Sequence, residues 1–183
     1  MRLFTAIDLS AEVRDNLTRL IDRLRPLARV KWSDPHNLHI TTKFIGAWPD
    51  ERLAELNETL AALGARSPMR IRIRGLGWFP NPHSPKVFWA GVEAPLGLAE
   101  LARDTEQSLE KLGVPAEKRP YSPHLTLARI KDSVLLESLH RSIAQMPAGA
   151  MGAFEADRFC LYRSDQAGGS SVYTKLADFP FSL

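Results

Sequence analysis

The chain has 183 residues, of which 44% are hydrophobic and 25% charged, and its formal net charge at pH 7 is +3. These values are ordinary for a globular protein, and they permit an RNA or phosphate-bearing partner without requiring one. The single cysteine, Cys160, excludes an internal disulfide and a cysteine metal cluster. No apolar run reaches the length of a membrane span, and Asp8 interrupts the N-terminal run too early for a signal peptide. We therefore expect a cytoplasmic protein without a membrane partner.

Apolar periodicity in the first half of the chain predicts six elements. In the order strand, helix, strand, helix, strand, strand, they span residues 3–9, 10–24, 38–46, 53–63, 69–74 and 87–92. Ser10 is the expected N-cap of the first helix, and Gly64 is the expected stop of the second. A long loop is predicted between the last two strands, over residues 75–85.

The predicted strand over 69–74 alternates strictly between apolar side chains and arginines. Its three arginines, Arg70, Arg72 and Arg74, should therefore share one face of a half-buried strand. Two interpretations remain open at this point. The arginines form either a solvated face or one wall of a cleft for an anionic ligand.

The second half of the chain repeats this order of elements. Helix, strand, helix, strand and a closing hairpin strand are predicted over residues 98–112, 123–130, 135–143, 154–162 and 172–176. The repetition indicates a diverged internal duplication, with pseudo-repeats of roughly 1–93 and 94–183. Because the connection between them is short, we expect a single bilobal α+β domain. It should contain two antiparallel-rich sheets flanked by helices, with a central cleft between the lobes.

Two short motifs dominate the functional reading of the sequence. His39 and Thr41 form the first His-x-Thr motif, and His124 and Thr126 form the second. Each motif lies in a strand-like run, where side chains two residues apart share a face. If the two strands lie side by side, two imidazoles and two hydroxyls face one cleft, which suits acid–base chemistry on a phosphate. Two unrelated sheet histidines are the plainer alternative, and the matched contexts argue against it.

The paired motifs resemble those of the 2H phosphoesterases, and most of all the RNA 2′,3′-cyclic phosphodiesterases, also called 2′-5′ RNA ligases. The resemblance covers nearly the whole chain. It is carried by RLFTAI at residues 2–7, KW at 31–32, NLHITTKFIG at 37–46, VFWAGV at 87–92, PHLTLAR at 123–129 and YTKL at 173–176. Thr42 departs from the leucine usual in the family, and we expect it to point away from the cleft.

This resemblance implies hydrolysis of a terminal 2′,3′-cyclic phosphate to a 2′-phosphomonoester without a metal ion or other cofactor. It also implies a weak reverse activity that joins RNA ends by a 2′-5′ bond. An RNA with a terminal 2′,3′-cyclic phosphate is the expected partner, and the protein is expected to be a monomer. Two histidines near their ordinary pKa can hold opposite protonation states near neutral pH. We assign His39 as the acid that protonates O3′ and His124 as the base that activates water, although the near-symmetry of the motifs leaves this direction open.

The hydroxyls of Thr41 and Thr126 are expected to donate hydrogen bonds to the non-bridging phosphate oxygens. By the resemblance, Phe44 stacks on the terminal base and Arg129 contacts the nucleotide. Both lie five residues after a motif histidine, so strict alternation would turn them away from the cleft unless a bulge intervenes.

Two further residues are expected to bind substrate. Lys43 lies four residues after His39, so strand alternation places its side chain on the cleft face. There it either binds phosphate or caps the sheet edge. Tyr121 lies in the basic loop before the second motif.

Three other functions are weighed against this one. A metal hydrolase using the two histidines as ligands lacks a His-x-x-x-His pair, and neither motif contains an acidic residue. A non-catalytic RNA-binding module would bind RNA whatever its terminal phosphate and would turn over nothing. The same chemistry could also act on a small cyclic nucleotide, a cyclic ADP-ribose phosphate or a 2′-5′ oligoadenylate.

Overall fold

The computed structural model describes residues 1–131, 133–147 and 149–183, which form strands and helices in alternating groups. The strands are β1 (Arg2–Asp8), β2 (Lys31–Trp32), β3 (His39–Ala47), β4 (Met69–Phe79), β5 (Val87–Glu93), β6 (His124–Arg129), β7 (Ala150–Ala156), β8 (Arg158–Ala167) and β9 (Ser170–Pro180). The α-helices are α1 (Ala11–Leu24), α2 (Leu53–Ala61), α3 (Leu96–Glu110) and α4 (Glu137–Gln145). Short 3-10 helices span Arg25–Leu27, Pro35–Asn37, Asp50–Arg52 and Ala62–Gly64. Within these described ranges, no helix combines the length and the hydropathy needed to cross a membrane.

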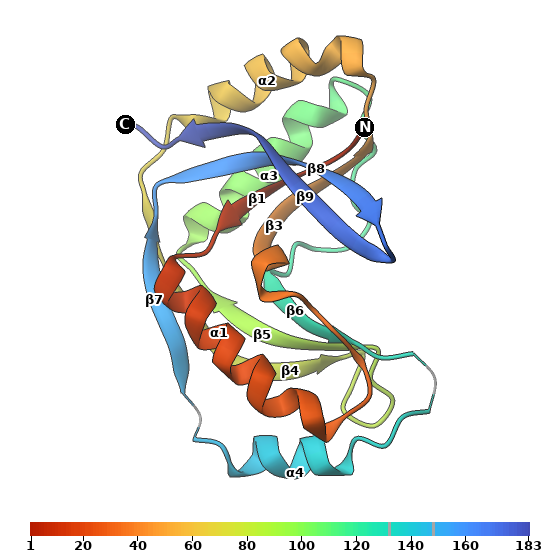
Figure 1. Cartoon of the computed structure of the whole chain (residues 1–183). Coiled ribbons are helices and arrows are strands. Elements are labelled where there is room, and N and C mark those ends of the chain that lie inside the picture. The colour runs from red at the N-terminus through yellow and green to blue at the C-terminus, as the bar shows by residue number, and fades with distance from the viewer. Residues whose placement is uncertain (132, 148) are drawn as a thin grey trace.

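The strands form two antiparallel sheets, which confirms the predicted α+β class. The first sheet has the order β3-β1-β8-β9, and the second has the order β2-β6-β5-β4-β7. Each sheet combines strands from both halves of the sequence, as the colours in Figure 1 show. The halves are therefore interlocked through backbone hydrogen bonds, and we infer that they fold together as one unit.

Helices cover one face of each sheet and leave the other face for the two motifs. Helix α1 contacts β7 of the second sheet, whereas α3 contacts β3 of the first (Figure 1). Ser10 caps α1 by accepting a hydrogen bond from the Val13 amide at 3.2 Å. The helix then buries its apolar stripe of Val13, Leu17, Leu20, Ile21 and Leu24. Because the helical sides are closed by these cores, polar groups can gather on the opposite faces.

Two predicted element boundaries are wrong. Strand β4 continues to Phe79, through residues predicted as a loop, because a bulge with Gly75 at φ +80° breaks the alternation without ending the strand. The single strand predicted over residues 154–162 is two strands that meet at Asp157. Strand β7 pairs with β4 in the second sheet, and β8 pairs with β1 in the first. Both segments have strand composition, so only the pairing partners reveal the change of sheet.

Each motif strand carries a bulge three residues after its histidine. In β3 the pairing with β1 passes from Thr41 to Lys43 and skips Thr42. In β6 the pairing with β5 passes from Thr126 to Ala128 and skips Leu127. Two successive side chains are therefore buried in each strand, and the next one returns to the face of the histidine.

The bulge in β3 decides where three neighbouring side chains point. Thr42 is buried away from the motif face, as expected, and its hydroxyl lies 2.7 Å from that of Thr5. Lys43 also points to the helical side, which is the reverse of the orientation expected from alternation. Its ammonium group donates to Glu106 at 3.2 Å and to the Pro115 carbonyl at 3.1 Å, and it lies 3.6 Å from Glu117. Lys43 therefore fastens α3 and its following loop to the first sheet.

We predict that Lys43→Met lowers the free energy of unfolding by about 1.5–3 kcal/mol, because it removes hydrogen bonds made by a buried charged group. Urea unfolding followed by circular dichroism measures this change. Lys31→Met, at an exposed position of β2, is the matched control and should change stability by less than about 0.5 kcal/mol. Equal stability of the two variants would contradict the anchoring role of Lys43.

Candidate active site

The two motif strands approach each other where the sheets meet. Strand β3 is the edge of the first sheet, and β6 lies next to the short edge strand β2 of the second. Cα atoms of β3 come within 8 Å of Cα atoms of β6, and Figure 1 shows these strands meeting in the middle of the molecule. In both strands the histidine and the threonine of the motif are half-buried and alternate with buried apolar residues.

Hydrogen bonds from the loop before each motif reach the strand of the other motif. The bond from Tyr121 crosses between the two sheets, whereas the bonds from Ser33, which follows β2, continue the pairing of β2 with β6. Tyr121, which precedes β6, donates its hydroxyl to the backbone carbonyl of Thr41 at 2.8 Å. Ser33, which precedes β3, donates its hydroxyl to the backbone carbonyl of Thr126 at 2.7 Å and its amide to the Leu127 carbonyl at 2.9 Å. The loop before each motif thus holds the threonine of the other motif. The hydroxyl of Tyr121, expected to bind substrate, is therefore used within the protein.

Both histidine rings are oriented in the same way. The Nδ1 atom of His39 lies 3.0 Å from the carbonyl oxygen of Asn37, and that of His124 lies 2.8 Å from the carbonyl oxygen of Ser122. A carbonyl oxygen can only accept, so Nδ1 must carry the proton in each ring. The neutral rings consequently keep their basic lone pair on Nε2, which is the atom left to exchange protons with a ligand.

The surroundings of His39 include a carboxylate. Oδ1 of Asp8 lies 3.5 Å from Nε2 of His39, whose side chain is only 7% exposed. Asp8 is itself held by the Tyr162 hydroxyl, which donates to Oδ1, and by the Lys175 ammonium group, 2.7 Å from Oδ2. The ring centroids of His39 and Tyr162 are 4.5 Å apart. His39 therefore sits in a fixed pocket of aromatic rings with one negative group at its reactive nitrogen.

These surroundings shift the pKa of both ionisable groups. Burial lowers the pKa of His39, and the Asn37 carbonyl and the Asp8 charge oppose that effect without cancelling it. Burial alone would raise the pKa of Asp8, but the hydrogen bonds from Lys175 and Tyr162 outweigh it, so the pKa lies below its usual range. Asp8 is thus ionised at neutral pH and stabilises the imidazolium form of His39 relative to an equally buried site without it.

His124 has a different environment. Its ring meets the edge of Phe79, with centroids 5.2 Å apart and an interplanar angle of 88°. His39 has a carboxylate oxygen within 4 Å, whereas His124 has none among the residues that the structure describes. The two motifs therefore present the same groups in unequal electrostatic settings.

Phe44 and Arg129, each five residues after a motif histidine, return to the motif face because of the bulges. Phe44 is 64% exposed, and its ring centroid lies 6.2 Å from that of Phe4. Phe4 in turn stacks on Tyr162 at 5.4 Å and meets the edge of Tyr173 at 4.9 Å. Arg129 is likewise exposed at the end of β6. An exposed aromatic ring beside the first motif and a guanidinium beside the second are suited to a nucleobase and a phosphate.

Sequence reasoning missed the residues that support His39. Asp8, Tyr162 and Lys175 lie on β1, β8 and β9, and only the order of strands in the first sheet brings them together. An acidic residue at the end of an otherwise apolar strand was a usable signal for Asp8. The carbonyls that orient the rings belong to Asn37 and Ser122, two residues before each histidine, and backbone groups carry no mark in the sequence.

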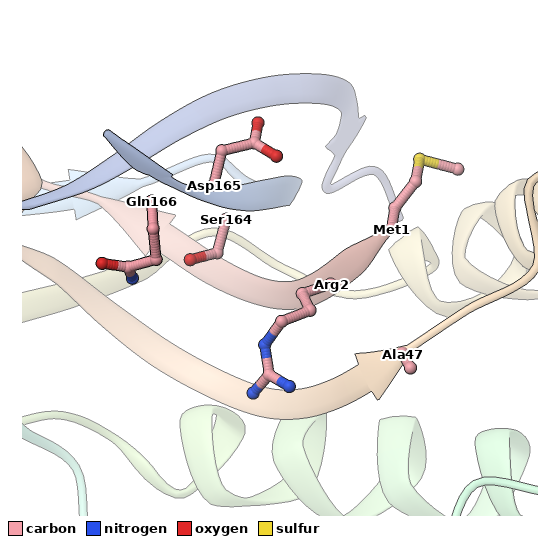
Figure 2. Close-up of a pocket in the computed structure, with 6 residues that line it drawn as sticks. All are labelled: Met1, Arg2, Ala47, Ser164, Asp165 and Gln166. Atoms are coloured by element: carbon pink, nitrogen blue, oxygen red, sulfur yellow. The ribbon is translucent and has the colours of Figure 1, made fainter. Parts of the chain in front are cut away.

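One cavity lies away from this cluster. A pocket of about 430 Å³ is lined by Met1, Arg2, Ala47, Ser164, Asp165 and Gln166 at the far end of the first sheet (Figure 2). None of the residues predicted from the sequence as site residues lines it. Among the residues that the structure describes, no group of three or more His, Cys, Asp or Glu side chains is arranged to hold a metal ion.

Comparison with known protein families gives a match over both halves of the chain. Residues 7–89 and 92–173 match the family described as LigT like Phosphoesterase. The chain is 34% identical over 181 residues to the RNA 2′,3′-cyclic phosphodiesterase of Methanothermobacter thermautotrophicus, covering 98% of each protein. It is 37% identical over 188 residues to the protein of the same name from Thermus thermophilus, covering 98% of this chain and 89% of the relative.

Solved structures agree with these sequence matches. A crystal structure of a Thermus thermophilus protein superposes with a TM-score of 0.83 at 33% identity, covering 99% of this chain and 98% of that one. The crystal structure of E. coli LigT complexed with 3′-AMP superposes with a TM-score of 0.80 at 26% identity, covering 100% and 98%. The likeness therefore extends over the whole fold.

We predict that Tyr121→Phe lowers the free energy of unfolding by about 1 kcal/mol, because the Thr41 carbonyl loses its donor at the junction of the sheets. Urea unfolding measures the change. Tyr173→Phe is the control, since the contacts of that ring are aromatic ones on the motif face. A Tyr121→Phe protein as stable as the parent would contradict the proposed role of this hydrogen bond.

We also predict that Asp8→Asn lowers the pKa of His39 further, because it removes the negative charge that favours the imidazolium form. The pH dependence of the His39 ring resonances in nuclear magnetic resonance spectra gives that pKa directly. Asp165→Asn, which removes an equal charge from an exposed ion pair with Arg163, should leave it unchanged. A His39 pKa that stays constant or rises in Asp8→Asn would show that the 3.5 Å contact has no electrostatic effect.

Proposed function

The chain belongs to the LigT-like phosphoesterase family, and we propose that it hydrolyses the 2′,3′-cyclic phosphate at the end of an RNA to a 2′-phosphomonoester without a metal ion. The observation that carries this proposal is the hydrogen bond from Tyr121, just before the second motif, to the carbonyl of Thr41 in the first motif, at the point where β3 approaches β6. It joins the two motif strands where the sheets meet. We propose that a phosphate bound there contacts both imidazole–hydroxyl pairs.

The proposed reaction needs one base, one acid and donors for the phosphate oxygens. Nε2 of His124 accepts a proton from water, and the water oxygen forms a bond to phosphorus. The bond from phosphorus to O3′ breaks, and Nε2 of His39 gives its proton to that leaving oxygen. The Thr41 and Thr126 hydroxyls donate to the non-bridging oxygens and stabilise the charge that grows on them. The products are a 2′-phosphate and a free 3′-hydroxyl.

The contact between Asp8 and His39 supports this direction of proton transfer. A carboxylate beside Nε2 stabilises the protonated ring, which is the form that a general acid requires. In the free protein burial lowers the pKa of His39, but a bound phosphodiester brings a second negative charge to the ring. His39 is therefore expected to take up its proton as the substrate binds. His124 has no such carboxylate among the described residues and suits the role of base.

The residues that follow the two bulges are proposed to bind the nucleotide. Phe44 offers an exposed ring on which a base can stack without preference for its identity. Arg129 offers a guanidinium next to the second motif. Because Lys43 and the Tyr121 hydroxyl are engaged inside the protein, we leave both out of the proposed substrate contacts.

The same geometry is proposed to support the reverse type of reaction. A ribose 5′-hydroxyl placed where water attacks would lose its proton to His124 and form a bond to phosphorus. The departure of O3′ would then leave two RNA ends joined by a 2′-5′ bond. Because water is far more abundant than an RNA end, hydrolysis should dominate unless a second RNA is held in place.

We predict that the purified protein converts an RNA ending in a 2′,3′-cyclic phosphate to a 2′-phosphate in the presence of EDTA. His39→Ala and His124→Ala should each lower kcat by about 10²–10⁴-fold, the usual contribution of one acid or base. Phosphorus nuclear magnetic resonance distinguishes a 2′-phosphate from a 3′-phosphate in the product. The pH profile of kcat should have two limbs, of which Asp8→Asn moves the alkaline one to lower pH because it lowers the pKa of the acid.

The control variant is His140→Ala, which should leave kcat unchanged because the ring of His140 packs on Trp78 at the helical side of β4. Loss of activity in EDTA that a divalent cation restores would contradict the metal-free reaction. Retained activity in His124→Ala would contradict the two-histidine scheme, and a 3′-phosphate product would contradict the assigned leaving group. Binding of RNA without any turnover would support the alternative function of a non-catalytic RNA-binding module.

A further inference from the structure

Strand β4 presents two of its arginines on the same face of the second sheet as the second motif. His124 is the register partner of Gly91, and Thr126 is the partner of Trp89. Residues directly opposite each other in an antiparallel pair share a face, so the odd-numbered residues of β5 lie on the motif face. Glu93 is the partner of Arg72. Arg72, and with it Arg70 two residues earlier, therefore faces the same side as His124.

The third arginine, Arg74, lies at the bulge of β4 nearest to His124. Gly91 stands between them in the sheet, and a Cβ added there would come within 2.4 Å of the Arg74 carbonyl oxygen. Glycine at this position thus permits a close approach of the backbones and adds no side chain of its own between the histidine and the arginines; the ring of Trp89 lies beside it, 3.6 Å from where the Cβ would be. We call Arg70, Arg72 and Arg74 the arginine ladder.

The guanidinium groups of the ladder are free to take a ligand. All three side chains are exposed. The arginine–carboxylate pairs within 4 Å that occur among the described residues involve other arginines, such as Arg66 with Asp104. Two carboxylates do face the ladder from neighbouring strands, Glu93 opposite Arg72 and Glu155 opposite Arg70. They moderate its charge without neutralising it.

We propose that the arginine ladder binds the phosphodiester backbone of the RNA beyond the nucleotide that carries the cyclic phosphate. The proposal rests on the function proposed above and adds to it the surface that binds the RNA backbone away from the reacting end. Its basis is that exposed, unpaired arginines and the proposed base His124 occupy one continuous face of the second sheet.

The geometry of the ladder matches this ligand. Alternate residues of an antiparallel strand are about 6.8 Å apart, so Arg70 and Arg72 place two cations at this spacing, and Arg74 follows them at the bulge. A row of this kind can contact successive phosphates of an extended strand. The planar guanidinium fork of arginine binds a phosphate with two hydrogen bonds, whereas a lysine ammonium group binds it as a point charge. A cyclic mononucleotide would fill the motifs and leave the ladder empty.

The test compares two substrates with the same terminal base, a 2′,3′-cyclic mononucleotide and a ten-nucleotide RNA that ends in a 2′,3′-cyclic phosphate. The triple variant Arg70→Gln, Arg72→Gln, Arg74→Gln should lower kcat/KM for the RNA by about tenfold at low salt and leave that for the mononucleotide unchanged. For the RNA, the negative slope of log(kcat/KM) against log salt concentration should become shallower by about two, because each of three lost single-strand phosphate contacts contributes about 0.7.

The matched control removes the same charge from exposed positions on the opposite side of the second sheet. Arg19, Arg23 and Arg25, on and just after α1, are replaced by glutamine together. This variant should behave as the parent with both substrates. The proposal is overturned if the control loses activity on RNA to the same extent, if the ladder variant affects both substrates equally, or if it affects neither.

A second variant tests whether the RNA instead follows the first sheet. Arg2 lines the pocket of about 430 Å³ with Ser164 and Gln166, and Figure 2 shows the Asp165 side chain directed away from the Arg2 guanidinium. If Arg2→Gln selectively lowers activity on the RNA and the ladder variant does not, the ladder is not the binding surface.

The outcome can also be read without turnover. Fluorescence anisotropy of a labelled RNA with a 3′-phosphate measures binding to each variant. If the parent turns over neither substrate, the proposed reaction fails. The ladder is then supported by weaker RNA binding to its variant than to the α1 control, and overturned by equal binding.

Discussion

The hydrogen bonds that cross between the two motif strands are the constraint on which the rest of the site depends. Each strand belongs to a different sheet, so no ladder of backbone hydrogen bonds sets their relative position. Tyr121 supplies that position by donating to the carbonyl of Thr41, and Ser33, at the end of β2, ties the segment that leads into β3 to the carbonyl of Thr126. These bonds end on the backbone of the motif residues themselves. Any displacement of one sheet relative to the other therefore moves the groups that would hold a phosphate.

The two motif strands share their local geometry but have unequal environments. Both histidines use Nδ1 to bind a carbonyl two residues earlier, and both strands bulge at the same offset. The first ring is buried among aromatic side chains with a carboxylate at its reactive nitrogen, whereas the second meets the edge of Phe79. Acid–base catalysis needs one protonated and one unprotonated partner. In the proposed reaction, the difference between the environments, and not the motif, would give the two positions separate roles.

The faces of the two sheets also divide the proposed work of binding. The first sheet gathers aromatic rings around His39, with Phe44 exposed at their margin. The second sheet offers cations, with Arg129 at the end of β6 and the arginine ladder on β4. Stacking surfaces and rows of cations are the two means by which proteins hold single-stranded RNA without reading its sequence. The motifs lie where these surfaces meet, so chemistry and binding share one boundary between the sheets.

The sequence by itself determined the fold class and the two His-x-Thr motifs, because alternation and helical spacing are local properties of the chain. It could not determine which way Lys43 and Phe44 point, since a bulge depends on pairing with another strand and reverses every side chain after it. It could not show that β7 and β8 belong to different sheets, or that Asp8 and Lys175, 167 residues apart, meet beside His39. Tertiary structure decided these points, because the pairing of distant strands sets both the register and the electrostatic surroundings of each ring.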